Sequence, residues 1–123
     1  YNIEIKIEVL EEIKVYCDKS QLKQVFINLI KNAIEEMDAG GKIEIEVEAT
    51  ENSSFISIRD EGPGIPQHLI HKLKEPFFTT KKNGTGLGLM ISNQIIEAHR
   101  GKLSIESEMG KGSLFTIELP RYQ

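Results

Sequence analysis

Polar and apolar residues alternate along several stretches of the chain, and this period of two predicts β-strands. The first ten residues, for example, place tyrosine, isoleucine or valine at the odd positions and mainly charged residues between them, as a half-buried strand would. Short polar turns connect neighbouring stretches and predict two antiparallel hairpins. The expected strands are residues 1–10, 13–17, 42–50, 55–60, 103–108 and 113–119.

Apolar residues recur every three or four positions elsewhere, and this spacing predicts helices with one buried stripe. The longest helix begins at Asp18, whose spacing to Gln21 resembles a capping box, and it ends before Gly40. A second helix is expected over residues 87–99 and a short one over 67–73. The elements together predict an α/β (α+β) two-layer sandwich, with a mixed, largely antiparallel sheet and three helices on one face.

Composition limits the class of protein. The chain has 123 residues, of which 39% are hydrophobic and 28% charged, as expected for one globular domain. Its formal net charge of −4 gives no electrostatic footprint for nucleic acid or an anionic membrane. The single cysteine, Cys17, excludes an internal disulfide, fits a reducing compartment and is interpreted as a small core residue. The chain does not begin with Met, so we expect a domain excised from a longer protein.

Two glycine-rich clusters bracket an aromatic pair and two lysines. The clusters are residues 60–66 and 84–89, with Phe77, Phe78, Lys81 and Lys82 between them. Free backbone N–H groups in such loops, or at the start of a helix, form sites for phosphate oxygens. The pattern therefore predicts a nucleotide-phosphate site with a lid-like loop, and two ordinary turns joined by a surface loop remain the alternative.

Two asparagines, Asn28 and Asn32, lie one helical turn apart on the flank of the apolar stripe of the long helix. Asparagine is a mediocre helix former, so the pair calls for an explanation. The amides could hydrogen-bond neighbouring loops. Alternatively, their oxygens could face a ligand or a hard cation such as Mg²⁺.

Asp60 ends a predicted strand on the same face as Ile56 and Ile58. A carboxylate on a buried face is costly unless it is hydrogen-bonded. It could accept a hydrogen bond from an exocyclic amine, or it could cap the next turn.

The three histidines are not expected to carry chemistry. His68 and His71 lie three residues apart in the short helix, but no third metal ligand is in view, and solvated helix positions are the better interpretation. His99 is interpreted as a helix-end residue rather than a phosphoacceptor.

These stretches together resemble the ATP-binding catalytic domain of sensor histidine kinases, in the superfamily shared with DNA gyrase B, MutL and the heat-shock chaperones. The resemblance covers essentially the whole chain and implies a Bergerat-type fold with a flexible ATP lid. The matching motifs are the asparagine box at residues 24–33, the D-x-G-x-G box at 60–64, the phenylalanine box at 75–81, the second glycine box at 84–89 and the last glycine turn at 110–113.

The resemblance implies roles for individual residues. Asp60 would accept a hydrogen bond from the adenine amino group. Asn32 would coordinate Mg²⁺ between the phosphates, and Asn28, Lys31 and Asn32 would be the catalytic residues. The residues implied to bind ATP are Asn28, Asn32, Asp60, Gly62, Gly64, Ile65, Phe78, Thr80, Lys81, Gly84, Thr85, Gly86, Leu87, Gly88, Leu89 and Thr116.

The resemblance also implies the reaction. The ATPases of the superfamily carry a water-activating glutamate at the position of Asn28, and an amide cannot take a proton at neutral pH, so transfer to an external acceptor is favoured over hydrolysis. The acceptor is expected to be a histidine in a separate dimerisation domain, with a response regulator downstream. This chain is expected to be a cytoplasmic monomer and the full-length protein a homodimer, with membrane anchoring left open. The residues after the asparagine box, at 35–37, are similar to the sporulation-kinase and nitrogen-regulation branch.

Two alternative functions remain open from the sequence. One is a protein serine kinase of the anti-sigma-factor type, and the other is a nucleotide-gated binding module without chemistry. An upstream helix with a histidine followed by an acidic residue would distinguish the histidine kinase from the serine kinase.

Overall fold

The computed structural model describes residues 3–9, 18–37, 40–70, 72–75 and 88–121. Within these ranges five strands and three helices form, and none of the helices is long and apolar enough to cross a membrane. The elements are β1 (Ile3–Val9), α1 (Lys19–Glu36), β2 (Gly41–Ala49), β3 (Ser53–Asp60), α2 (Gln67–Ile70), α3 (Gly88–Ala98), β4 (Lys102–Glu108) and β5 (Gly112–Pro120). The expected strand at 13–17, which includes Cys17, lies outside the described residues.

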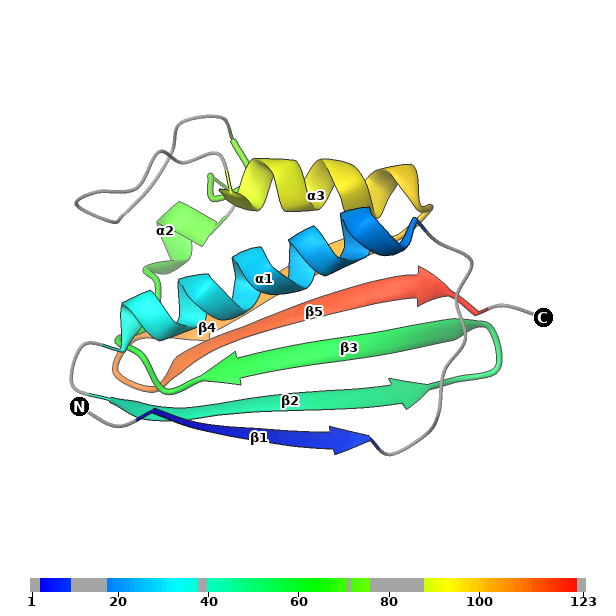
Figure 1. Ribbon diagram of the computed structural model, residues 1–123. Helices are drawn as coiled ribbons and strands as arrows, with labels where there is room; N and C mark the ends of the chain where they lie inside the picture. The colour runs from blue at the N-terminus through cyan, green and yellow to red at the C-terminus, as the bar shows by residue number, and fades with distance from the viewer. Residues whose placement is uncertain (1–2, 10–17, 38–39, 71, 76–87, 122–123) are drawn as a thin grey trace.

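The strands form one sheet in the order β1-β2-β3-β5-β4. β1 pairs with β2 in parallel, and the other neighbours are antiparallel, including the expected β2–β3 and β4–β5 hairpins. All three helices lie on the same side of the sheet (Figure 1). The predicted two-layer sandwich with a mixed, largely antiparallel sheet is therefore confirmed.

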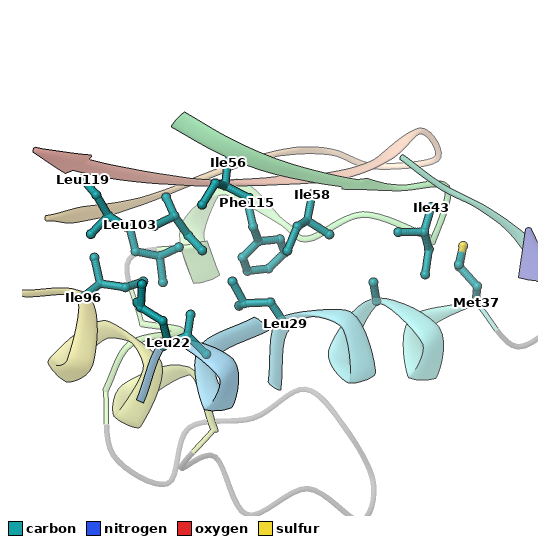
Figure 2. Close-up of a cluster of buried hydrophobic side chains, with 13 residues drawn as sticks. Leu22, Leu29, Met37, Ile43, Ile56, Ile58, Ile96, Leu103, Phe115 and Leu119 are labelled. Carbon is teal, nitrogen blue, oxygen red and sulfur yellow. The ribbon is translucent and has the colours of Figure 1, made fainter. Parts of the chain in front are cut away.

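The core lies between the sheet and the two longer helices. Figure 2 shows Leu29 of α1 pointing toward Ile58 and Phe115 on the sheet, and Ile96 of α3 pointing toward Leu103. Every second residue of β3 and β5 contributes to this layer, because successive side chains of a strand point to opposite faces. The same alternation brings Asp60, the last residue of β3, onto the helix-covered face of the sheet.

The edge strand β1 differs from the expectation of a half-buried strand. Ile5, Ile7 and Val9 are 46%, 65% and 60% exposed, although their neighbours on β2 pack against the core. Figure 1 shows the reason, since β1 is the strand farthest from the helices. Alternation in the sequence predicts which residues share a face, but burial of that face depends on a covering helix.

The long helix α1 starts and stops where the sequence predicts. The Asp18 side chain accepts a hydrogen bond from the backbone N–H of Gln21, at 3.1 Å, as an N-cap residue does. At the other end Gly40 adopts a positive φ of 89° and donates its N–H to the carbonyl of Met37. These two ends fix the length of α1 along the sheet.

His99 connects the end of α3 to the start of α1. Its Nε2 accepts from the backbone N–H of Asp18 at 2.9 Å, so the proton of the neutral ring is on Nδ1, which donates to the carbonyl of Ile95 at 2.8 Å. Both ring nitrogens are thus engaged in structural hydrogen bonds. This arrangement supports the interpretation of His99 as a helix-end residue.

Replacing His99 by alanine is expected to lower the stability of the domain by about 1 kcal/mol, because the Asp18 N–H loses its side-chain partner and the Ile95 carbonyl keeps only the backbone N–H of residue 99. This corresponds to a decrease of roughly 4 °C in the melting temperature. Replacing the exposed His68 on α2 serves as the control and should leave the melting temperature unchanged. Equal effects of the two substitutions in thermal melts would contradict this role of His99.

Candidate nucleotide-binding site

Asp60 is the most deeply buried acidic side chain of the described residues, with 3% of its surface exposed. One of its carboxylate oxygens, Oδ1, accepts from the backbone N–H of Gly62 at 2.9 Å, and the backbone N–H of Ser113 also donates to the carboxylate. Burial raises the pKa of the Asp60 carboxyl above its usual value, and these two N–H bonds oppose the shift. Asp60 therefore caps the next turn, as one of the two expected alternatives proposed. A carboxylate has about four acceptor positions, so capacity remains for a ligand.

The glycine turn after Asp60 packs onto the tip of the β4–β5 hairpin. The backbone N–H of Gly110 donates to the carbonyl of Pro63 at 2.8 Å, and that of Ile65 donates to the hydroxyl of Ser107 at 2.7 Å. Gly64 has a positive φ of 84°, and a Cβ added there would lie 2.3 Å from the carbonyl oxygen of Glu108. The turn can approach the hairpin this closely only because position 64 is glycine.

The C-terminal end of α1 lies against the same turn. A Cβ added at Gly62 would lie 3.2 Å from Cβ of Glu36 and 3.0 Å from Oδ1 of Asp60. Asn32 is one helical turn before Glu36, so it projects from the flank of α1 that faces the turn. The half-buried Asn32 and the exposed Lys31 therefore belong to the end of α1 nearest Asp60.

Asn28 lies one helical turn before Asn32, toward the N-terminus of α1, and it contacts α3. Its Oδ1 accepts from Nε2 of Gln24 at 3.0 Å, and its Nδ2 donates to the hydroxyl of the buried Ser92 at 3.4 Å. The structure therefore shows an amide that hydrogen-bonds neighbouring side chains. Its position in line with Asn32 keeps both asparagines on one flank of the helix.

The lid-like loop falls largely outside the described residues. Only Gly88 and Leu89 of its predicted site residues are described. Gly88 is exposed at the start of α3, with open space around its Cα, and Leu89 packs against the core. The predicted site residues that lie outside the described ranges are Phe78, Thr80, Lys81, Gly84, Thr85, Gly86 and Leu87.

Thr116, which the resemblance implied to bind ATP, lies on a different face of the sheet from Asp60. It belongs to the even-numbered residues of β5, whereas the buried residues of this strand are odd-numbered, so its side chain lies on the face opposite to Asp60. Ser113 is the β5 residue that lies beside Asp60, because it pairs directly with Asp60 in the sheet, and it is only 7% exposed. Counting in steps of two back from Phe115 would have identified Ser113 from the sequence alone.

The histidines show no metal site in the described part of the chain. His68 is exposed on α2, and His71 lies outside the described residues. Among the described side chains no group of three or more His, Cys, Asp or Glu residues is placed to hold a metal ion.

Comparison with known proteins identifies the family. The profile of the family described as histidine kinase-, DNA gyrase B-, and HSP90-like ATPase matches residues 17–123. Sporulation kinase E of Bacillus subtilis is 48% identical over 121 residues, which are 97% of this chain and 16% of that protein. This relative agrees with the sporulation-kinase branch that the sequence suggested.

Solved structures show the same fold. The nucleotide-free catalytic domain of histidine kinase ThkA has a TM-score of 0.87 and 42% identity, and the match covers 97% of this chain and 79% of that one. Full-length ShkA in complex with AMPPNP has a TM-score of 0.87 and 28% identity, and the match covers 98% of this chain and 26% of that one. The chain thus belongs to the family of histidine kinase-, DNA gyrase B- and HSP90-like ATPase domains, on its histidine kinase side.

Proposed function

We propose that this chain is the ATP-binding kinase domain of a sensor histidine kinase. It binds ATP with Mg²⁺ and delivers the γ-phosphate to a histidine on a separate dimerisation domain. The relatives support this reaction over the serine-kinase alternative, since the similar proteins are named as sporulation kinases and histidine kinases. The chain spans about a sixth of sporulation kinase E, so the acceptor domain, the homodimer and the response regulator belong to the proposal for the whole protein.

The observation that carries this proposal is the environment of Asp60. The carboxyl group of Asp60 lies at the buried end of β3, where two backbone N–H groups donate to it, and it retains acceptor positions that no described side chain fills. An exocyclic amine is the ligand group that such a site would bind, because it offers protons to an acceptor in a low-dielectric setting. Adenine carries this amine.

Burial of Asp60 predicts a pH dependence of binding. The pKa of the Asp60 carboxyl is raised in the folded chain, so the protonated form contributes stability that is lost as the pH rises through the folded-state pKa. Binding should follow the opposite course, because a protonated carboxyl is a weaker acceptor. We expect ATP affinity to fall on acidification, and the fall should begin at a higher pH than it would if Asp60 had the pKa of an ordinary carboxyl.

The measurement is the dissociation constant for ATP between pH 8 and pH 5, for the wild type and for Asp60→Asn. Titration of the nucleotide's phosphates affects both proteins, so the difference between the two profiles isolates Asp60. Parallel profiles would contradict the prediction.

Asn28 supports phosphoryl transfer rather than hydrolysis. General-base activation of water needs a group that can take a proton, and the Asn28 amide cannot. Its contacts with Gln24 and Ser92 also hold it in place between α1 and α3. Phosphoryl transfer needs chiefly positioning and neutralisation of charge, which the domain could supply to an acceptor from outside.

The residues near Asp60 fit a Mg²⁺ ion that is held mainly by the nucleotide. Mg²⁺ prefers oxygen ligands and keeps several waters, so it is commonly bound by few protein groups together with substrate phosphates. The Asn32 amide supplies such an oxygen, and the described residues offer no cluster of acidic or histidine ligands that would hold the ion alone. Asn32 would hold the ion through its amide oxygen, and Lys31 would add a positive charge nearby. The chemistry that bound Mg²⁺ would supply is neutralisation of phosphate charge.

The proposed function is tested by supplying the missing acceptor. The chain is incubated with γ-labelled ATP and a histidine-containing dimerisation domain from a sporulation kinase relative. We expect label on the acceptor that is labile in acid and stable in base, together with slow release of phosphate when the acceptor is omitted. Acid-stable label would indicate a hydroxyl acceptor, and rapid phosphate release without acceptor would indicate a hydrolase, so either result would overturn the proposal.

A further inference from the structure

Three polar side chains form a row across the sheet next to the proposed adenine site. Asp60 on β3 pairs with Ser113 on β5, and Ser113 pairs with Ser107 on β4. All three belong to the helix-covered face, one row beyond the apolar residues of the core. We call these residues the polar row. Directly paired residues on one face have their Cβ atoms about 5 Å apart, so each side chain can influence the next.

The contacts of Ser107 determine where the hydroxyl protons lie. Its Oγ lies 2.7 Å from the backbone nitrogen of Ile65, 2.9 Å from the carbonyl oxygen of Gly112 and 2.9 Å from Oγ of Ser113. The Ile65 N–H can only donate, and the Gly112 carbonyl can only accept. The single proton of Ser107 therefore goes to Gly112, and all three contacts are hydrogen bonds only if Ser113 donates its own proton to Ser107.

This arrangement leaves the Ser113 oxygen as an acceptor toward Asp60. Its one proton is directed to the far side, away from the carboxylate. Asp60 and Ser113 then present two neighbouring acceptors and no hydroxyl proton. A ligand that offers an amine is favoured at this place, and a ligand that offers a carbonyl meets lone pairs on both sides.

We propose that Ser107 is a positioning residue that holds the Ser113 proton away from the site, so that the site selects 6-aminopurine nucleotides over 6-oxopurine nucleotides. The proposal rests on the proposed function, because it assumes that the base lies at Asp60. A site that presents fixed acceptors discriminates strongly against a group that cannot donate to them. Without the Ser107 hydroxyl, Ser113 is free to rotate and to donate to a carbonyl.

The test compares binding of ATP with binding of inosine triphosphate, in which a carbonyl replaces the 6-amino group. The quantity measured is the dissociation constant of inosine triphosphate divided by that of ATP, so a lower ratio means weaker selection for ATP. We expect Ser107→Ala to lower this ratio about tenfold, because inosine triphosphate gains a donor that the wild type withholds. Ser107→Thr keeps a hydroxyl at this position and should restore the ratio.

Gln67→Ala is the matched control for loosening of the turn. The Gln67 side chain donates to the backbone carbonyl of Ser107 at 2.6 Å, so this substitution removes a bond between the same two segments and leaves the hydroxyls untouched. Gln67→Ala should weaken the binding of ATP and of inosine triphosphate equally. If Ser107→Ala also weakens the binding of both nucleotides equally and leaves the ratio unchanged, Ser107 has only a structural role and the proposal is wrong.

Ser113→Ala provides a second test that does not require Ser107→Ala to fold. Removing the Ser113 oxygen should also lower the ratio, and adding Ser107→Ala in that background should change it no further. An unchanged ratio in Ser113→Ala would overturn the proposal, because the Ser113 lone pairs would then not face the base. A wild-type chain that binds neither nucleotide would instead contradict the proposed function itself.

Discussion

Asp60→Asn is expected to weaken ATP binding by roughly tenfold to a hundredfold, the loss that follows when a charge-assisted hydrogen bond of about 1.5–3 kcal/mol is removed. The amide oxygen of asparagine can still accept from Gly62, so the turn should keep its shape. The amide nitrogen, however, places a donor where the carboxylate offered an acceptor. Calorimetric titration with ATP measures the loss.

Glu61→Gln is the matched control for this prediction. It removes the same charge one residue away, and its amide oxygen can still accept from the Lys42 backbone N–H, as Oε1 of Glu61 does at 2.8 Å. ATP affinity should be unchanged in this variant, and both variants should melt near the wild-type temperature. Equal effects on affinity would show that net charge, rather than the position of Asp60, determines binding.

Gly64→Ala is expected to destabilise the domain by about 2–4 kcal/mol and to abolish tight ATP binding. The added Cβ would lie 2.3 Å from the Glu108 carbonyl oxygen and 2.8 Å from its carbon, both backbone atoms of the hairpin. The φ of +84° adds the cost of a left-handed conformation in a residue with a side chain. The melting temperature should fall by roughly 10 °C.

Gly110→Ala separates the two contributions. Gly110 has nearly the same φ, +83°, but an added Cβ would meet no atom within 4 Å. Its substitution should therefore cost only the conformational strain, about 1 kcal/mol. If the two variants melt at the same temperature, the close approach of the turn to the hairpin is not what requires glycine at position 64.

Local patterns in the sequence predict the elements of this fold but not the order of its strands. The stripe of α1 and the alternation of β3 and β5 arise from each element's own geometry, so they can be read without a structure. The placement of β5 between β3 and β4 depends on contacts such as Asp60 with Ser113, which are far apart in the chain. The exposure of β1 likewise depends on where α1 lies, and the sequence of β1 alone does not show whether a helix covers this strand.

The individual residues of the candidate site could be predicted from the sequence, but the contacts between them were harder to predict. The acidic residue at the end of β3 and the glycines after it follow from the sequence. Ser113, rather than Thr116, lies on the same face of the sheet as Asp60 because side chains alternate along β5. This alternation can be recognised in the sequence. The role of Ser107 was not visible, because a serine in an exposed-looking hairpin becomes informative only when Ile65, Gly112 and Ser113 are seen around its hydroxyl.

The most direct test of a nucleotide site at Asp60 is calorimetric titration of the 123-residue chain with ATP, with and without Mg²⁺. We predict saturable binding of one ATP per chain that strengthens when Mg²⁺ is present and is competed by ADP. We also predict that Asn32→Ala reduces the effect of Mg²⁺ while ATP alone still binds. No saturable heat at millimolar ATP, under conditions where the chain is folded, would contradict the account.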